Sequence, residues 1–563
     1  MGVTDNIEKK LKENVKNAIS EAFGDIEMPD FLIEVPKDSA NGDYSTNAAM
    51  LLARTLRKAP RAIADEAVKH IKTAKPIDKV EVAGAGFINF YLSNSYLYDV
   101  LEEVEKQGAS YGCCNIGNGE KVCLEFVSAN PTGPMHMGNA RGGAIGDSLA
   151  NIMKKAGFDV EKEFYVNDAG AQIDKFGRSL DARFLEIVDG HCDFPEDGYQ
   201  GEDIRDHAKA YIEEFGTGLR AEEESVRRKK LIEYALPKNL EKMKKDLSDY
   251  RVFYDKWFFE SELHESGYVT ETIELLKKTN HVYEKDGAVW FKSTDFLTKK
   301  GDDDRTYKDD VLVRANGIPT YFAADIAYHR NKLEKRKFDT AINIWGADHH
   351  GHIARMKGAL GALGIDPERL HVITMQLVRL MDKGEIVRMS KRTGRMITLS
   401  DLLQDIGIDA ARFFFNLRQA GSHFDFDLSL AVEQSNDNPV FYVQYAHARI
   451  CSIIRLLAED GLCATAYADT DTSLLDAPQE TALLKRLAAF PGEIASAAES
   501  MEPSRITRYV MEVAADFHSF YNACRIRGEE ENLAKARLKL CEATRTVIAN
   551  CLEILGVTAS EKM

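Results

Sequence analysis

The 563-residue sequence lacks the features that mark secreted and membrane proteins. Its nine cysteines are scattered and form no C-x-x-C pair, which argues against a zinc ribbon and favours a reducing compartment. No stretch approaches the ~18 uninterrupted apolar residues of a membrane span. The charged first segment has no apolar core of a secretory signal, so a cytoplasmic protein is expected. Glycine and proline are not enriched, and roughly 150 residues per domain predicts three or four globular domains.

Positive charge is also scarce, since the net charge is −17. That balance at first argues against a nucleic-acid partner, but binding depends on where the charges lie. Two stretches are locally basic, Val226–Lys245 and Arg388–Arg395. The first is most simply the solvated face of a helix. The second has no acidic residue and contains Gly394, which is typical of a loop that meets an anion.

The order of predicted elements indicates three parts. Helical patterns and one strand, Phe87–Leu92 after the turn Gly84–Gly86, indicate a small α+β module over the first part of the chain. After a Gly-rich and Asn-rich break at Gly112–Gly119, the apolar run Val122–Val127 is typical of a buried parallel strand. A Gly/Pro loop then leads into a helix at Ala144–Lys155. Strand, loop and helix in this order begin a nucleotide-binding α/β layer.

Three further strands are expected at Val311–Val313, Thr340–Trp345 and His371–Leu377, each followed by a loop and a helix. Such alternation favours an α/β fold with a Rossmann-like, doubly wound parallel sheet. From about Asn438 helical periodicity dominates, which indicates an α-helical bundle. The domains are therefore expected at residues 1–110 (N-terminal α+β), 111–430 (catalytic, with insertions) and 431–563 (helical bundle).

Two loops carry candidate chemistry. His136 and Gly138 lie where the Gly/Pro loop enters the helix, and a helix N-terminus offers unpaired N–H groups to phosphate oxygens. His136 could donate to an oxygen that gains charge, although it could equally cap the helix while the glycines make turns. Lys391, in the later loop Arg388–Gly394, could hold a leaving pyrophosphate, whereas a lone lysine is usually only solvated.

In this order the two loops resemble the HIGH and KMSKS signatures of class I aminoacyl-tRNA synthetases. Four blocks resemble those of arginyl-tRNA synthetases: residues 128–147, Tyr165–Ile173, Pro319–His329 and Trp345–His352. GDYSTNAA (42–49) and GAGFINFYL (84–92) resemble the N-terminal domain of that family, and Asn438–Arg449 resembles the start of its anticodon-binding domain. The resemblance covers nearly the whole chain, and the combination is more specific than either short motif.

The resemblance implies an arginine–tRNA ligase. Such an enzyme joins L-arginine and ATP into arginyl-adenylate, with tRNA needed for that step, and transfers the arginyl group to the 3′-terminal adenosine of tRNA(Arg). The N-terminal domain would contact the D-loop at the tRNA elbow, and the bundle would bind the anticodon. ATP is expected with Mg²⁺ held largely by phosphates. No protein-bound zinc is expected, because the spacing of His349, His350 and His352 is loose. A monomer is expected.

The same resemblance implies residue roles. His136 and Lys391 are the expected catalytic residues. Asn139 stands where the family usually has a second histidine and cannot carry a proton, whereas Arg388 replaces a lysine and keeps the charge. The expected ATP-binding residues are Pro134, His136, Gly138, Asn139, Gly346, Asp348, Arg388, Met389, Ser390 and Lys391.

Arginine recognition requires carboxylates, because the guanidinium is a planar, permanent cation with five donors. Asp325 is the best candidate, after a strand-like segment Pro319–Phe322, with Tyr321 nearby; a simple acid at a helix N-terminus is the alternative. The expected arginine-binding residues are Glu125, Ser128, Ala129, Asn130, Asn139, Tyr321, Asp325 and His349. Aromatic and arginine side chains can stack on anticodon bases, and those expected to bind tRNA are Tyr442, Tyr445, Arg449 and Arg508.

Three other functions remain open at this point. A class I synthetase for another amino acid would share both signature loops. A nucleotidyltransferase-like enzyme that adenylylates a small metabolite could share the first loop, although the long helical C-terminal region argues against it. A non-catalytic RNA-binding protein would lose nothing when Lys391 is replaced.

Overall fold

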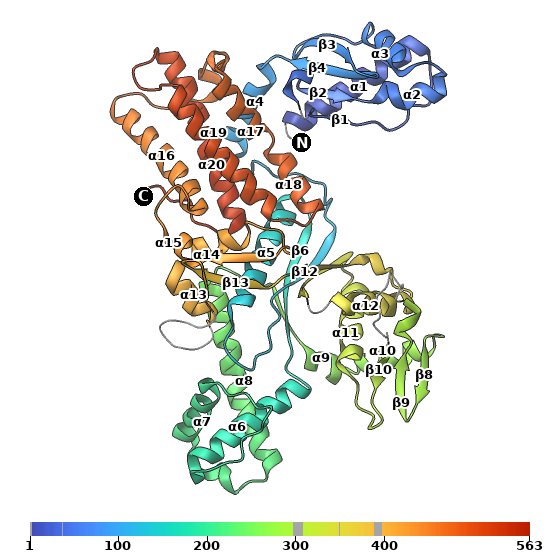
Figure 1. Ribbon diagram of the computed structural model, residues 1–563, viewed down its shortest axis with the longest axis vertical. Helices are drawn as coiled ribbons and strands as arrows, with labels where there is room; N and C mark the ends of the chain where they lie inside the picture. The colour runs from blue at the N-terminus through green and yellow to red at the C-terminus, as the bar shows by residue number, and fades with distance from the viewer. Residues whose placement is uncertain (1–2, 37, 297–307, 348–349, 388–396) are drawn as a thin grey trace.

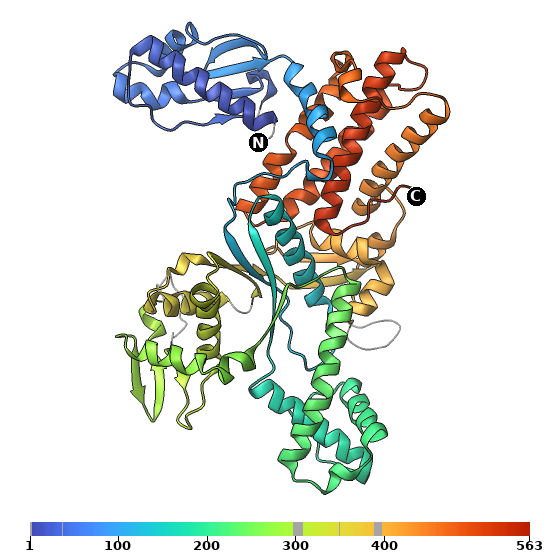
Figure 2. The same cartoon turned by 180° about the vertical axis from the view of Figure 1, so that it is seen from behind.

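The computed structural model describes residues 3–36, 38–296, 308–347, 350–387 and 397–563. The molecule is elongated, with the N-terminal domain at one end and a helical insertion at the other (Figures 1 and 2). The central sheet lies between them, beside the C-terminal bundle. No helix in the described ranges combines the length and apolar character of a membrane span.

The N-terminal domain is an antiparallel sheet with helices. The sheet has the order β1-β2-β4-β3. Its strands are β1 (Ile33–Glu34), β2 (Tyr44–Thr46), β3 (Ile77–Ala83) and β4 (Phe87–Leu92). Its helices are α1 (Val3–Phe23), α2 (Ala48–Leu56) and α3 (Pro60–Val68), and α4 (Ser95–Gln107) follows as the connection to the rest of the molecule. The predicted strand at 87–92 is confirmed.

The centre is a five-stranded parallel sheet of order β12-β11-β5-β6-β7. Its strands are β5 (Lys121–Glu125), β6 (Asp159–Val166), β7 (Lys256–Phe259), β11 (Thr340–Gly346) and β12 (Leu370–Met375). Helices α5 (Met137–Lys155) and α12 (His350–Ala362) follow β5 and β11. The predicted α/β fold with a parallel sheet is confirmed. Because all five strands run the same way, their carboxyl ends meet at one edge, where ligands bind in such sheets.

Two insertions interrupt this sheet. The first, between β6 and β7, has its own apolar core and contains α6 (Ala171–Asp189), α7 (Glu202–Phe215) and α8 (Glu224–Asp249). The second, between β7 and β11, contains α9 (Glu260–Glu265), α10 (Tyr268–Lys277), β8 (Val282–Lys285), β9 (Ala288–Phe291), β10 (Asp310–Val313) and α11 (Tyr321–Arg330).

Two expectations fail in the second insertion. The strand predicted at 311–313 does not join the parallel sheet, because β10 pairs antiparallel with β9 in a separate three-stranded sheet. The prediction of a strand-like segment at residues 319–322 is also wrong. Helix α11 begins at Tyr321, and the Thr320 side chain caps it by accepting a hydrogen bond from the N–H of Ala323.

A second small sheet follows β12, where a loop and helix were expected. β13 (Val378–Asp382) turns back into β14 (Glu385–Val387), so that part of the prediction is wrong. β15 (Phe424–Asp427) pairs parallel with β13 and completes the order β14-β13-β15. Three helices accompany this sheet: α13 (Leu399–Ile406), α14 (Ile408–Phe415) and α15 (Leu428–Val432).

The C-terminal bundle confirms the predicted helical region. Its helices are α16 (Pro439–Glu459), α17 (Pro478–Ala488), α18 (Phe490–Glu499), α19 (Ser504–Ala523) and α20 (Glu531–Leu555). Apolar side chains from the bundle, α5 and α14 form one continuous core. Helix α4 packs on α17 and α20, so the N-terminal domain is attached to the bundle.

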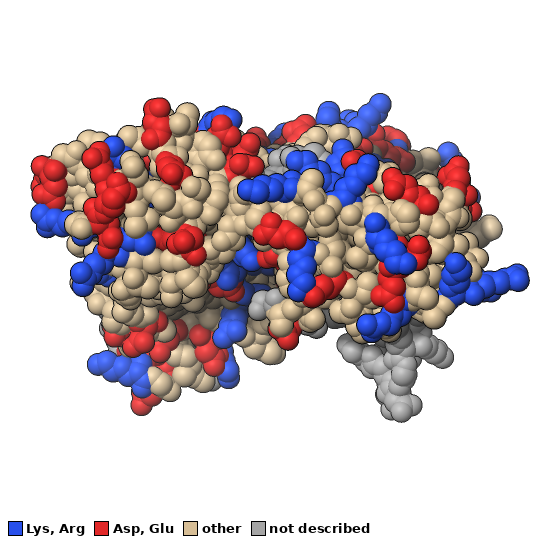
Figure 3. All heavy atoms as spheres, turned by 90° about the horizontal axis from the view of Figure 1, so that it is seen from above, with Lys and Arg blue, Asp and Glu red and all other residues tan. Residues whose placement is uncertain are grey.

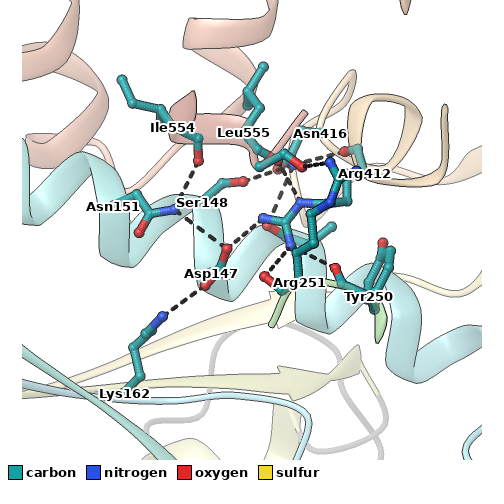
Figure 4. Close-up of polar contacts among 12 residues, drawn as sticks. Asp147, Ser148, Asn151, Lys162, Tyr250, Arg251, Arg412, Asn416, Ile554 and Leu555 are labelled. Carbon is teal, nitrogen blue, oxygen red and sulfur yellow. Dashed lines mark hydrogen bonds and ion pairs between the residues drawn. The ribbon is translucent and has the colours of Figure 1, made fainter. Parts of the chain in front are cut away.

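A buried polar network ties the bundle to the centre (Figure 4). The fully buried guanidinium of Arg412 on α14 pairs with Asp147 on α5 at 2.5 Å and donates to the carbonyl of Leu555 at the end of α20 at 2.7 Å. It also donates to the carbonyl of Tyr250, at the end of helix α8 in the first insertion. Lys162 on β6 lies 3.0 Å from the other Asp147 oxygen. One side chain thus joins three parts of the molecule.

Candidate functional site

The turn after β5 is strained. Val127 and Ser128 have positive φ angles, 70° and 40°, which non-glycine residues seldom adopt and which concentrate at functional sites. The Ser128 hydroxyl fixes this turn by donating to Glu125 at 2.9 Å and accepting from the backbone N–H of Tyr165 at 3.1 Å. The loop that leads to His136 is therefore held in one conformation by two neighbouring strands.

His136 lies at the start of α5, with part of its side chain in solvent. Its backbone N–H donates to the side-chain oxygen of Asn139 at 3.0 Å, so Asn139 stabilises the helix start. Removal of the ring from bulk water lowers the pKa of His136, which favours the neutral imidazole. A Cβ on Gly138 would lie 3.2 Å from this ring, so glycine keeps the space beside it open. Pro134, also expected here, is exposed.

The chain returns to His136 on the far side of residues 388–396. Thr398 forms a β-bridge with His136, and the N–H of Leu399 donates to the carbonyl of Met135 at 2.9 Å. A cavity of about 320 Å³ lies between the start of α5 and the small sheet. Its lining is formed by His136, Met137, Gly138, Val378, Arg379, Leu380, Ile386, Val387 and Ile397. Both described flanks of the second signature loop thus lie beside the first.

Arg388, Met389, Ser390 and Lys391 themselves lie outside the described residues, as do Asp348 and His349. Gly346, the last residue of β11, lies at the carboxyl edge of the sheet and is partly exposed.

Asp325 lies in the second insertion, facing α12. It is the fifth residue of α11, beyond the first turn, and one carboxylate oxygen lies 3.1 Å from Nε2 of His352. The side chain is 32% exposed, so it remains accessible to a ligand. Tyr321, one turn earlier, is 66% exposed with its ring 6.3 Å from that of His352. The alternative of an acid in the first helical turn does not fit this placement.

Glu260 is a second carboxylate of this region that the sequence did not reveal. It begins α9 at the carboxyl end of β7, and Tyr165 Oη donates to it at 2.9 Å. Burial, together with the nearby charge of Asp325, raises the pKa of Glu260. The neighbouring sequence, ESELHE, looks like any solvated helical turn, so only the fold marks this residue.

Glu125, an expected arginine-binding residue, ends the first strand of the parallel sheet, β5. It is buried, and one carboxylate oxygen accepts from Lys332 Nζ at 2.6 Å and from the side-chain amide of Asn343 at 3.0 Å. Its charge is therefore compensated within the protein. Ser128 and Ala129 are partly exposed at the strained turn, and Asn130 is exposed. The arginine-binding roles of these four residues stay predictions.

The bundle collects aromatic side chains around an arginine. Tyr442 and Tyr445 on α16 lie with their rings 5.0 and 6.1 Å from that of His518 on α19. The Arg449 guanidinium lies 4.5 Å from the centre of the Tyr521 ring. The structure thus brings three of the four predicted tRNA-binding residues together. The fourth, Arg508, is exposed on α19 ten residues before His518, or about 15 Å along the helix.

Three family models match consecutive parts of the chain: the arginyl tRNA synthetase N-terminal domain over residues 9–92, the class I (R) tRNA synthetase catalytic domain over 101–419, and the DALR anticodon binding domain over 443–563. The arginine–tRNA ligase of Acetivibrio thermocellus is 56% identical over 100% of both chains. That of Ruminiclostridium cellulolyticum is 52% identical over 99% of this chain and 100% of its own. The chain belongs to the arginyl-tRNA synthetase family.

Solved structures agree with this family. The arginyl-tRNA synthetase of Thermus thermophilus, 22% identical, superposes with a TM-score of 0.73 over 99% of this chain and 100% of its own, which shows the fold. A Campylobacter jejuni structure assigned to the arginyl-tRNA synthetases is 33% identical, with a TM-score of 0.76 over 84% of this chain and 100% of its own.

Arginyl-tRNA synthetases use ATP as a substrate, so a nucleotide site is required in this chain. Within the part of the chain that the structure describes, no group of three or more His, Cys, Asp or Glu side chains is placed to hold a metal ion.

Proposed function

We propose that this chain is an ATP-dependent arginine–tRNA ligase that forms arginyl-adenylate and transfers the arginyl group to the 3′-terminal adenosine of tRNA(Arg). One observation carries the proposal beyond family membership. Two carboxylates, Asp325 and Glu260, lie at the same sheet edge as the His136 loop. A cationic amino acid and a nucleotide can therefore meet in one crevice.

Asp325 and Glu260 suit a guanidinium better than an ammonium. Carboxylates that approach a flat cation from two sides can accept several of its five donors, whereas lysine offers a single compact charge. Tyr165 Oη fixes the orientation of Glu260, and Tyr321 forms the exposed rim. In this proposal Glu125 contributes through Ser128, which it holds at the turn where the amino acid's backbone groups would lie.

ATP would lie across the start of α5. The cavity between His136 and Val387 suits the adenine ring because apolar side chains form much of its lining. Gly346 and Asp348 would contact the ribose of ATP, and Mg²⁺ would be bound mainly by the phosphates. A carboxylate oxygen of arginine attacks the α-phosphorus, and the bond to pyrophosphate breaks. His136, Arg388 and Lys391 stabilise the negative charge that develops.

The tRNA would contact both ends of the molecule. The N-terminal domain has a polar cavity of about 600 Å³, and its lining includes Asn41, Asn89 and Tyr91. We propose that this cavity binds the D-loop of the tRNA and that Tyr442 and Tyr445 of the bundle stack on anticodon bases. Figure 3 shows acidic and basic side chains interspersed on one face, so basic groups are available locally despite the net charge. Domain borders at residues 110 and 430 belong to this proposal.

A monomeric state and a cytoplasmic location remain predictions. Size-exclusion chromatography with light scattering tests the first, because a dimer would elute at twice the 63.0 kDa mass of one chain. Fractionation of the source cells tests the second.

The test of the proposed function is amino-acid-dependent release of pyrophosphate from ATP in the presence of tRNA. Arginine should support release and attachment to tRNA, and lysine should support neither. Release with lysine, cysteine or glutamate but not arginine would overturn the assignment. Release that needs no RNA and leaves tRNA uncharged would instead favour an enzyme that adenylylates a small metabolite.

A further inference from the structure

Arg141 is a buried cation to which the reaction above assigns no role. It lies on α5, about one turn after Gly138, and is fully buried. Its guanidinium donates to three backbone carbonyls, those of Gln376 at 2.7 Å, Gln419 at 3.0 Å and Ser422 at 3.2 Å. No acidic side chain within the described ranges forms an ion pair with it, and its Nε has no partner there.

Such an arrangement is costly. Burial without an anion lowers the pKa of Arg141 to about 10, because the charged form loses its hydration. A hydrophobic side chain of similar length would avoid that penalty. The compensating benefit is the joining of separate backbone segments. The planar guanidinium of an arginine can donate to carbonyls of several segments in a fixed geometry.

The three carbonyls belong to the two segments that enter the small sheet. Gln376 lies just before β13, and Ser422 lies just before β15; Val378 and Phe424, two residues further on in each segment, are the first pair of that parallel ladder. The N–H of Gln376 also donates to the carbonyl of Ala420 at 3.0 Å, which joins the segments to each other. Arg141 therefore fixes the small sheet to α5 at the point where both of its parallel strands begin.

The position of this sheet determines the shape of the cavity beside His136. Residues 136–138 at the start of α5 form one wall, and β13 and β14 form the other through Val378, Leu380 and Val387. The geometry points to Arg141 as the positioning residue that sets the separation of these walls, and thereby the fit of the adenine nucleotide. This inference rests on the proposed function, because it takes the cavity as the site of ATP.

Arg369 provides a matched control. It also donates to three backbone carbonyls, those of Asp339, Leu333 and Phe338, at 2.9, 3.1 and 2.6 Å. It precedes β12 at the amino edge of the parallel sheet, whereas Arg141 contacts the residue after β12 at the carboxyl edge. Arg369→Lys should lower stability without changing the cavity.

The experiment compares Arg141→Lys, Arg369→Lys and the wild-type chain in tRNA charging at varied ATP and varied arginine, with Tm measured in parallel. Arg141→Lys should raise the KM for ATP about tenfold, equivalent to one charge-assisted hydrogen bond. The KM for arginine should stay within about twofold, because the acidic pocket lies on other elements. Arg369→Lys should lower Tm and leave both KM values unchanged.

An unchanged KM for ATP in Arg141→Lys, or an equal rise in Arg369→Lys, would overturn the inference and leave Arg141 a structural anchor only. The assays are run well below the measured Tm of each variant, where nearly all of the protein is folded, so partial unfolding does not change KM. If Arg141→Lys gives no folded protein, Phe424→Leu takes its place, since the guanidinium lies 5.8 Å from that ring. Phe424→Leu should still raise the KM for ATP, and an unchanged value would count against the inference. Failure of the wild-type chain to charge arginine would refute the proposed function instead.

Discussion

Replacing Asp325 by asparagine removes one negative charge from the proposed guanidinium pocket and leaves its shape almost unchanged. Loss of one partner from a buried, hydrogen-bonded charge pair costs about 2–5 kcal/mol. The Asp325 side chain is 32% exposed, so water screens part of the interaction and the lower end applies. A loss of about 2–3 kcal/mol in the free energy of interaction with the guanidinium corresponds to a roughly 30- to 150-fold lower kcat/KM for arginine.

The assay for Asp325→Asn is charging of tRNA at varied arginine with ATP saturating, so that the loss appears in the amino-acid dependence. Glu334→Gln is the control, because Glu334 follows α11 directly and pairs with Arg330, away from the pocket. It should leave the KM for arginine unchanged. A kcat/KM for arginine within about threefold of the wild-type value in Asp325→Asn would refute the assignment of the pocket.

Further outcomes are expected for Glu260, His136, Lys391 and Arg412. Because burial raises the pKa of Glu260, its ionised form destabilises the free protein at neutral pH, so Glu260→Gln should raise Tm there while weakening arginine binding. In the wild-type chain the affinity for arginine should fall as the pH is lowered from neutral, because Glu260, with its raised pKa, takes up a proton before an ordinary glutamate would, and Glu260→Gln should remove this dependence in calorimetric titrations. His136→Ala should slow adenylate formation about 100-fold or more in stopped-flow measurements, with Tm unchanged because the side chain is partly in solvent. Lys391→Ala should slow the same step by a similar order while tRNA affinity, measured by filter binding, stays nearly intact. Arg412→Met should cost about 3–5 kcal/mol in denaturant unfolding, because it leaves Asp147 buried with a single cationic partner.

The sequence predicted the parts of the fold that local patterns determine. The apolar run at 122–127, the Gly/Pro loop and the following helix are consecutive, so their arrangement needed no distant contact. Strand β10 shows the limit of this reasoning. Its three residues 311–313 have the right propensity, but which strand they pair with depends on contacts with residues far away in the sequence. Tyr321 and Phe322 are typical strand residues, but the Thr320 side chain caps a helix that begins at Tyr321.

Some residues of the candidate site could be proposed from the sequence, and others could not. His136 could be proposed from its loop, and Asp325 and Tyr321 from resemblance to a family motif. Glu260 has no such signal, because its importance arises only when β7 brings it beside Tyr165. The sequence gives no signal for Arg141 either, because its partners are backbone carbonyls 235 to 281 residues away.

The central claim is that an anionic pocket beside an ATP site selects arginine for attachment to tRNA. Charging of bulk tRNA with each of the twenty amino acids in turn tests it most directly. The account predicts ATP-dependent attachment of arginine and of no other amino acid at a comparable rate. Attachment of a different amino acid in preference to arginine, or of none, would contradict it.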